Sequence, residues 1–156
     1  MPTRIKLSEL TPKIQRQIEK AGRAAEKKVQ LMLPNAVSTG KSKGHDFVLL
    51  NGKKVEVKSV NSMGVALALE KNEDGVLDWR NKVAHHVILV HNNNFHFVSA
   101  ETLRNAILAL KLKGAEGTYK FTLGEIKPSL KTWHKKILIG PRGPAWLNKY
   151  FGVEVA

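Results

Sequence analysis

The chain has 156 residues, and its hydrophobic content of 42% is enough to build the core of one domain. It contains no cysteine, which excludes disulfides, zinc fingers and iron–sulfur centres, so a bound metal ion would need oxygen or imidazole ligands. With 26 lysines and arginines against 13 aspartates and glutamates, the formal net charge is +13, which favours a polyanion as partner, nucleic acid first of all.

The sequence also bears on where the protein works. No apolar run approaches the roughly 20 residues of a membrane span, and the start MPTRIKLSEL lacks the apolar segment of a secretory signal. We therefore expect a soluble, intracellular protein, in the cytoplasm of a prokaryote or of a cell infected by a phage or virus. The alternative explanation of the charge is a basic protein that merely stays soluble, or one that binds anionic lipid.

A long helix is predicted near the start of the chain. Thr11 followed by Pro12 is typical of a helix N-cap with proline in the first turn. Apolar residues then recur at three- and four-residue spacing and stop before Pro34. This stripe consists of Ile14, Ile18, Ala21, Ala25, Val29 and Met32. We expect a helix of about 20 residues that packs on the core through the stripe.

Residues 44–60, GHDFVLLNGKKVEVKSV, are predicted to form a β-hairpin after a polar loop. The strand period of two sends Val55 and Val57 to one face of the second strand. Glu56 and Lys58 therefore point together to the other face.

The turn of this hairpin decides whether Asp46 joins them. A two-residue turn at Asn51-Gly52 would set Asp46 opposite Val57, on the wrong face. A three-residue turn at residues 50–52, with glycine in the left-handed position of a bulge, sets Asp46 opposite Glu56 instead. We expect the bulged turn, because glycine occupies the position that such a turn requires.

The rest of the chain combines short strands with two more helices. Ser99 is predicted to cap a helix that runs to about Leu112, with Glu101 in its first turn, and AWLNKYF to form a closing helix. Strands are expected at 65–69, 87–90, 95–98 and 118–123, and a further apolar run lies at 136–139. The order of helix, three or four strands, helix and strand predicts a single α/β domain over residues 1–156, built around a mixed sheet.

If the bulged turn forms, Asp46 and Glu56 stand side by side, with Lys58 one step along. Two carboxylates at close range repel each other unless a cation lies between them, so this arrangement predicts a divalent metal ion. Oxygen ligands favour Mg²⁺, usually completed by water and phosphate oxygens, and Mn²⁺ is expected to substitute for it. Such a site suits phosphodiester hydrolysis, with a metal-polarised phosphate and a lysine that orients the nucleophile and offsets the developing charge.

The same residues resemble a known family. Asp46, followed ten residues later by Glu56-Val57-Lys58 and preceded by a helix with Glu26, is similar to the motif of the PD-(D/E)xK nuclease superfamily. The stretches GRAAEKKV, GHDF and VEVKS look most like archaeal-type Holliday junction resolvases and small restriction or homing endonucleases. The resemblance implies a restriction-endonuclease-like αβββαβ core, with a central mixed sheet flanked by helices, and Mg²⁺-dependent cleavage of DNA. It also implies four catalytic residues, of which Asp46, Glu56 and Glu26 are metal ligands and Lys58 is the catalytic lysine.

Basic residues outside the hairpin are expected to contact DNA phosphates. The candidates are Lys41, Lys43, Arg80, Lys135, Lys136 and Arg142. Trp79 and Trp146 fit core packing better than DNA binding. We also expect a homodimer, since two subunits supply one active site for each strand of a near-symmetric target.

Other interpretations stay open. His45 stands where the family has proline, and a D…ExK spacing arises often by chance in lysine-rich chains, so Glu56 and Lys58 can also be an ion pair on a solvated face. Glu26 can equally be a plain surface carboxylate. The same fold also suits a non-catalytic DNA-binding module or an RNA-cleaving nuclease. The run HHVILVHNNNFH at 85–96 offers a histidine-metal nuclease, but it fits two strands and a turn better, with histidines that are exposed or face DNA.

Overall fold

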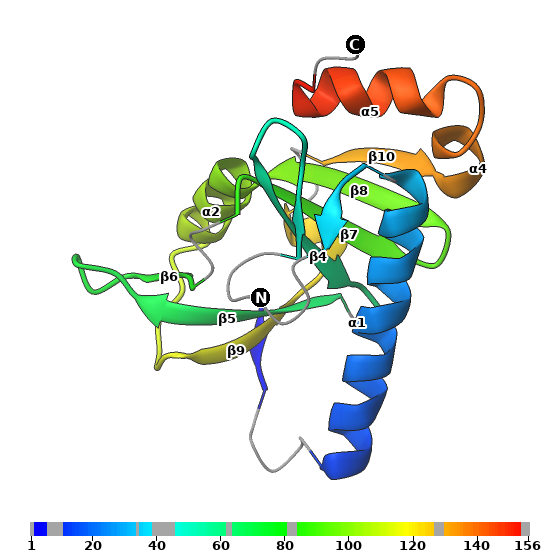
Figure 1. Ribbon diagram of the computed structural model, residues 1–156. Coiled ribbons are helices and arrows are strands. Elements are labelled where there is room, and N and C mark those ends of the chain that lie inside the picture. Colours follow the sequence, from blue (N-terminus) through cyan, green and yellow to red (C-terminus); the bar gives the residue numbers. More distant parts are fainter. Residues whose placement is uncertain are drawn as a thin grey trace.

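The computed structural model describes residues 2–5, 11–33, 35–38, 46–61, 64–80, 84–126 and 130–153. Within these ranges the chain is a mixed α/β structure with two sheets and several helices (Figure 1). The helices are α1 (Pro12–Met32), α2 (Ala100–Ala109), α3 (Leu123–Ile126), α4 (Lys135–Leu138) and α5 (Gly143–Phe151). The strands are β1 (Thr3–Arg4), β2 (Val37–Ser38), β3 (Phe47–Val48), β4 (Lys54–Ser59), β5 (Val65–Lys71), β6 (Leu77–Trp79), β7 (His86–His91), β8 (Asn94–Ser99), β9 (Gly117–Phe121) and β10 (Lys131–His134).

The larger sheet has six strands in the order β10-β8-β7-β4-β3-β2. Strands β4 and β7 are parallel, and the other neighbouring pairs are antiparallel, so this sheet is mixed as predicted. The chain passes from β4 to β7 through β5 and β6, which belong to the second sheet. That sheet is antiparallel and has four strands in the order β1-β9-β5-β6.

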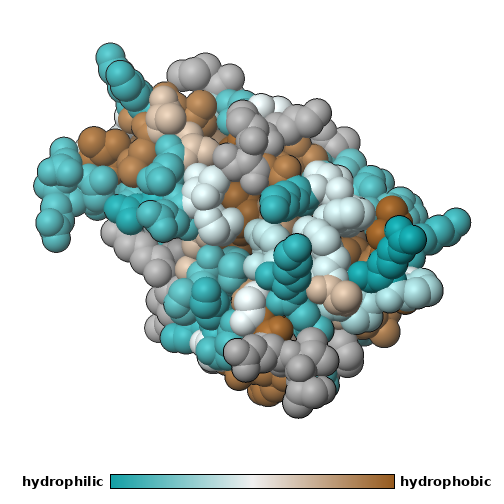
Figure 2. Space-filling view, turned by 90° about the horizontal axis from the view of Figure 1, so that it is seen from above, coloured by the Kyte–Doolittle hydropathy of each residue, from teal (hydrophilic) through white to brown (hydrophobic). Residues whose placement is uncertain are grey.

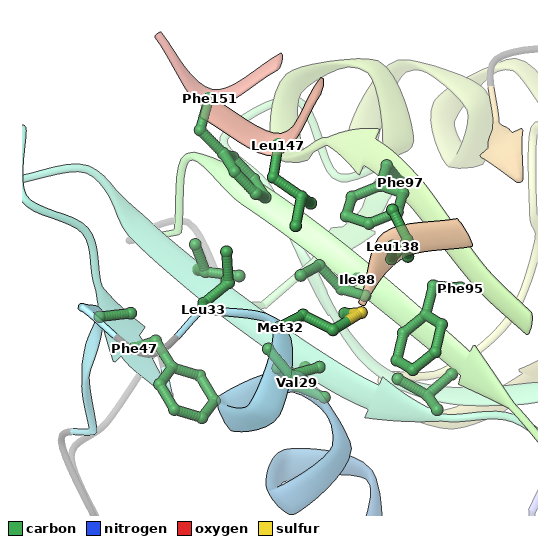
Figure 3. Packing of buried hydrophobic residues seen from close by; sticks show 14 of the residues in the cluster. Val29, Met32, Leu33, Phe47, Ile88, Phe95, Phe97, Leu138, Leu147 and Phe151 are labelled. Carbon is green, nitrogen blue, oxygen red and sulfur yellow. The ribbon is translucent and has the colours of Figure 1, made fainter. Parts of the chain in front are cut away.

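One face of the larger sheet is covered by three helices. Because side chains alternate along a strand, Ile88 of β7 and Phe97 of β8 point to this face. They pack against Met32 of α1, Leu138 of α4 and Leu147 of α5, and Figure 3 shows these side chains meeting over the strands. The helical layer therefore fixes the position of α1 relative to β4.

The opposite face of the larger sheet packs on the second sheet and on α2. Val87 and Leu89 of β7 share a second core with Leu67 of β5, Leu103 of α2 and Phe121 of β9. The two cores lie on opposite sides of the same strands, which gives a structure of three layers.

Helix α1 begins and ends as the sequence predicts, but its apolar stripe is not buried along the whole helix. Thr11 caps it by accepting a hydrogen bond from the Ile14 backbone amide at 3.2 Å, and the helix ends at Met32. However, Ile14 and Ile18 are 39% and 54% exposed, so the expected core packing is wrong for the first half. A groove of about 260 Å³, also lined by Ala66 of β5, separates this half from the second sheet, and the half extends beyond the sheets in Figure 1.

Other parts of the predicted order need correction too. Among the described residues between α1 and α2 there are seven strands, β2 to β8, in place of the three or four expected. Two of them, β2 and β6, have only two and three residues, too few for a pattern of alternation to be recognised. Helix α2 begins after Ser99 as predicted but ends at Ala109, because Lys111 has a positive φ of 47° that a helix does not allow.

Large exposed hydrophobic side chains of the described residues come from several parts of the surface, and only Ile14 and Ile18 among them line the groove described above. Leu31, Val37 and Leu50 are examples, and they come from three different elements or loops. On the face seen from above, where α5 lies, hydrophilic side chains are spread between smaller hydrophobic areas (Figure 2). None of the helices in the described ranges is long and apolar enough to cross a membrane.

The run at 85–96 forms two strands and a turn, as predicted, but of its four histidines His85 alone is exposed. His96 is only 9% exposed, and its Nδ1 lies 2.7 Å from the Thr132 hydroxyl. Both ring nitrogens of His86 are buried, without a hydrogen-bond partner among the described residues. The His86 ring packs on Phe151 and Tyr150, at centroid distances of 4.9 and 5.7 Å.

The aromatic environment of His86 has an electrostatic consequence. Burial, and then the charges of Lys53 and His85, lower the pKa of His86 from 6.5 to about 4. A charged His86 would have to be accommodated beside the aromatic rings of Tyr150 and Phe151.

Both tryptophans expected in the interior pack there, as predicted. Trp146 is partly buried and stacks on Tyr150, and Trp79 is buried in the second core.

We predict that His86 makes the fold sensitive to acid. Because its pKa is lower in the folded chain than in the unfolded chain, the unfolded chain binds the proton first, and stability is lost as the pH falls from 6.5 towards 4. Between pH 7 and pH 5 this loss should reach about 2 kcal/mol at most. Urea unfolding of the wild type and of His86→Phe at both pH values measures it. The variant should lose less stability on acidification, and equal losses would contradict the assignment.

Candidate active site

The β3–β4 hairpin has the bulged turn that the sequence predicts. Phe47 pairs with Val55 and Val48 with Lys54, the register that a three-residue turn produces. The Leu49 amide donates to the Lys53 carbonyl at 2.9 Å, which closes the turn. Gly52 has a φ of +81°, in the left-handed region that favours glycine.

Asp46 lies at the point where β3 begins and is bonded to β4 in two ways. Its backbone amide donates to the Val55 carbonyl at 2.8 Å. Its carboxylate Oδ2 accepts a hydrogen bond from the Val57 amide at 2.7 Å. Asp46 immediately precedes Phe47, the first paired residue of β3, and its carboxylate continues the bonding to β4. The register of the hairpin therefore determines the position of this carboxylate.

Glu56 and Lys58 come from β4 itself. Val55 and Val57 belong to the core beneath the helical layer, so the alternation predicted for this strand is confirmed. Glu56 is only 8% exposed, and its Oε1 lies 3.3 Å from the Lys58 ammonium nitrogen. A carboxylate so far from water needs such a partner to offset its loss of hydration.

Glu26 approaches from α1 and completes the group. Burial raises the pKa of Glu26 to about 7, together with a hydrogen bond to the Asp46 side chain and the negative charges of Asp46 and Glu56, while Arg23 lowers it. Three carboxylates from α1, from the start of β3 and from β4 therefore lie close enough to influence one another. Helix packing brings Glu26 to the hairpin, because the next turns of α1 bury Val29 and Met32 against the larger sheet.

Glu26, Asp46 and Glu56 offer carboxylate oxygens as donors, which is the ligand type that the expected metal ion would need. Carboxylate oxygens are the ligands that Mg²⁺ and Mn²⁺ prefer, and adjacent carboxylates that repel one another gain stability when a cation binds. Within the described ranges, no group of three or more His, Cys, Asp or Glu side chains is already arranged to hold an ion. Binding an ion here would therefore require side-chain adjustment of Glu26, Asp46 or Glu56.

The described residues among those expected to contact DNA are not gathered in one place. Lys41 and Lys43 lie outside the described residues. Arg80 is exposed after β6 of the second sheet, with its Nε 3.8 Å from Glu70 Oε2. Lys135 and Lys136 lie on α4 and Arg142 precedes α5, in the helical layer on the other side of the larger sheet.

Sequence reasoning did not single out one feature beside these carboxylates. Arg23 acts on the charge of Glu26, and it belongs to a series of exposed basic residues on α1. The signal was available in the sequence as a regular three- and four-residue spacing of lysine and arginine. Gln30, in contrast, caps the end of α1 by donating to the Leu33 and Ala36 carbonyls at 3.2 and 3.3 Å.

Comparisons with known proteins add no relative. A scan against protein-family models and a search of curated proteins found no match for this chain.

We predict that replacing Glu26 by glutamine stabilises the metal-free protein above pH 7. Glutamine can still donate a hydrogen bond to Asp46, but it removes one of three mutually repelling charges, a gain on the order of 1 kcal/mol. Urea unfolding at pH 8 in EDTA measures the free energy of unfolding. Glu19→Gln, an exposed carboxylate on the same helix, is the matched control and should change little. Destabilisation by Glu26→Gln would contradict the proximity of the three carboxylates.

Proposed function

We propose that this protein is a metal-dependent endonuclease that hydrolyses phosphodiester bonds of DNA. The observation that carries the proposal is the convergence of Glu26, Asp46 and Glu56 with Lys58 beside Glu56. Repelling carboxylates gathered in one place destabilise a fold, so their convergence points to a bound cation. The formal net charge of +13 supplies the attraction for a polyanionic substrate.

Each side chain has a role that follows from its position. Asp46, Glu56 and Glu26 would hold Mg²⁺ or Mn²⁺, and the ion when bound would supply Lewis-acid polarisation of the phosphate. The Val57 amide holds Asp46 in place through Oδ2, and the same side chain is hydrogen-bonded to Glu26. Lys58, held at 3.3 Å from Glu56, can donate to the attacking water and to a phosphate oxygen, and thereby offsets negative charge that grows during hydrolysis.

The restriction-endonuclease-like core is part of the same proposal. Support comes from α1, the β3–β4 hairpin and the parallel pairing of β4 with β7 in a mixed sheet. The crossover from β4 to β7 through β5 and β6 is a departure from an αβββαβ order. We also propose a homodimer, because one site per subunit would allow both strands of a duplex to be cut.

The test is a panel of substrates with one protein preparation. Plain duplex, four-way junction, flap and single-stranded DNA, and tRNA beside them, are incubated with Mg²⁺, with Mn²⁺ and with EDTA. Cleavage of a DNA substrate that needs the divalent ion and stops in EDTA is the expected result. Metal-independent binding without cleavage would make the chain a DNA-binding module, and cleavage of tRNA alone would make it a ribonuclease.

We predict that Lys58→Ala lowers the cleavage rate by about 100-fold or more, since loss of one positioned donor to developing charge typically has that effect. DNA affinity should stay within a few-fold, because one lysine contributes little to a field of +13. Lys53→Ala, an exposed lysine in the same hairpin, is the matched control and should cleave like the wild type. Cleavage by Lys58→Ala within a few-fold of wild type would rule out the proposed role of this lysine.

A further inference from the structure

Five basic residues follow one face of α1. They are Lys13, Arg16, Lys20, Arg23 and Lys27, here called the basic stripe, and all five are exposed. Their spacing alternates between three and four residues, which matches the 3.6-residue turn of an α-helix and keeps them on one side. At 1.5 Å per residue the stripe extends over about 21 Å.

The basic stripe faces away from the core. At 100° per residue it lies on the side of α1 opposite the buried Ala25, Val29 and Met32. Its first three members lie on the half of the helix that is exposed all round and extends beyond the sheets in Figure 1. An extended polyanion can therefore approach these three residues from solvent.

All members of the stripe are basic, and Glu19, three residues after Arg16 and four before Arg23, forms no ion pair with them among the described contacts. Solvated helix faces are usually stabilised by Glu–Lys pairs at three- or four-residue spacing, whereas like charges at that spacing destabilise the helix. Within the part of the chain that the structure describes, no member of the stripe takes part in an ion pair. A polyanion bound along this face would relieve the repulsion between neighbouring members.

The stripe also leads to the candidate active site. On the helix, Glu26 lies on the flank between the stripe and the packed face, one residue before Lys27 and three after Arg23. Arg23 is close enough to act on the charge of Glu26. An anionic chain bound along the stripe would thus reach Asp46 and Glu56 at the stripe's carboxyl-terminal end.

We propose that the basic stripe of α1 binds the sugar–phosphate backbone of DNA and guides it to the carboxylates of Glu26, Asp46 and Glu56. The inference rests on the proposed nuclease function and names a surface through which that substrate is positioned. Phosphate contacts of this kind fix register without reading sequence, so the stripe would bind DNA of any sequence. Its contribution would fall with salt as counterions are released.

The experiment compares two triple variants with equal changes of charge. Lys13→Gln/Arg16→Gln/Lys20→Gln neutralises the first three members of the stripe, and Lys71→Gln/Lys111→Gln/Lys113→Gln neutralises exposed lysines on β5 and after α2. Affinity for a fluorescently labelled DNA duplex is measured by anisotropy in EDTA over a series of salt concentrations. Circular dichroism confirms that both variants keep their helix content, and light scattering reports the oligomeric state.

The stripe variant should bind about tenfold more weakly or worse, with a log–log salt slope that is shallower by about 2 to 3, whereas the control should stay within a few-fold of wild type. Equal weakening of both variants would attribute binding to the overall charge and overturn the proposal. A changed oligomeric state with unchanged affinity would also overturn it, because α1 would then dock protein. Binding is measured without metal, so a protein that does not cleave DNA can still show the expected loss of affinity. Failure of the nuclease proposal would appear in the cleavage panel, and failure of the stripe proposal would appear in the binding measurement.

Discussion

The hydrogen bond between the Asp46 carboxylate and the Val57 amide is the contact on which the candidate site depends. It measures 2.7 Å, and it exists because the bulged turn at Gly52 sets the register of the hairpin. A slip of one residue would exchange the faces of β4 and send Glu56 towards the helical layer. The conformation of a single glycine is therefore linked to the position of two acidic side chains.

Electrostatic repulsion between carboxylates is the second constraint on the site. Burial, and then the nearby Asp46 and Glu56 carboxylates, raise the pKa of Glu26, whereas Arg23 lowers it. The Lys58 ammonium nitrogen lies 3.3 Å from Glu56 Oε1. Repulsion between these carboxylates lowers the stability of the metal-free protein. A sequence selected for stability alone would carry an amide in place of one of the acids. A bound cation would offset the repulsion between the carboxylates, and the proposed metal-dependent function follows from this.

Local features of the fold could be read from the sequence, whereas features that depend on distant packing could not. Thr11, Ser99 and Gly52 each act on residues within a few positions, and the helix starts and the turn that they predict are confirmed. The crossover through β5 and β6 and the second sheet depend on pairings between distant segments, such as Leu67 with Tyr119. The apolar stripe of α1 indicated its packed face correctly, but the sequence does not reveal how far the sheet extends beneath the helix. For the candidate site, the alternation around Glu56 was predictable, while the approach of Glu26 required the packing of α1 on the larger sheet.

The two halves of α1 differ in what they contact, and this difference connects the fold with the proposed activity. The second half is anchored by Val29 and Met32, so it can hold Glu26 at a defined place beside the hairpin. The first half makes few core contacts, and its exposed Ile14 and Ile18, together with the like charges of the basic stripe, contribute little to stability. A free helix of this length would be marginal in water by itself, and its continuity with the anchored half keeps it formed. A rigid arm that is fixed at the acidic residues and basic along its free part is well suited to align an extended anion with those residues.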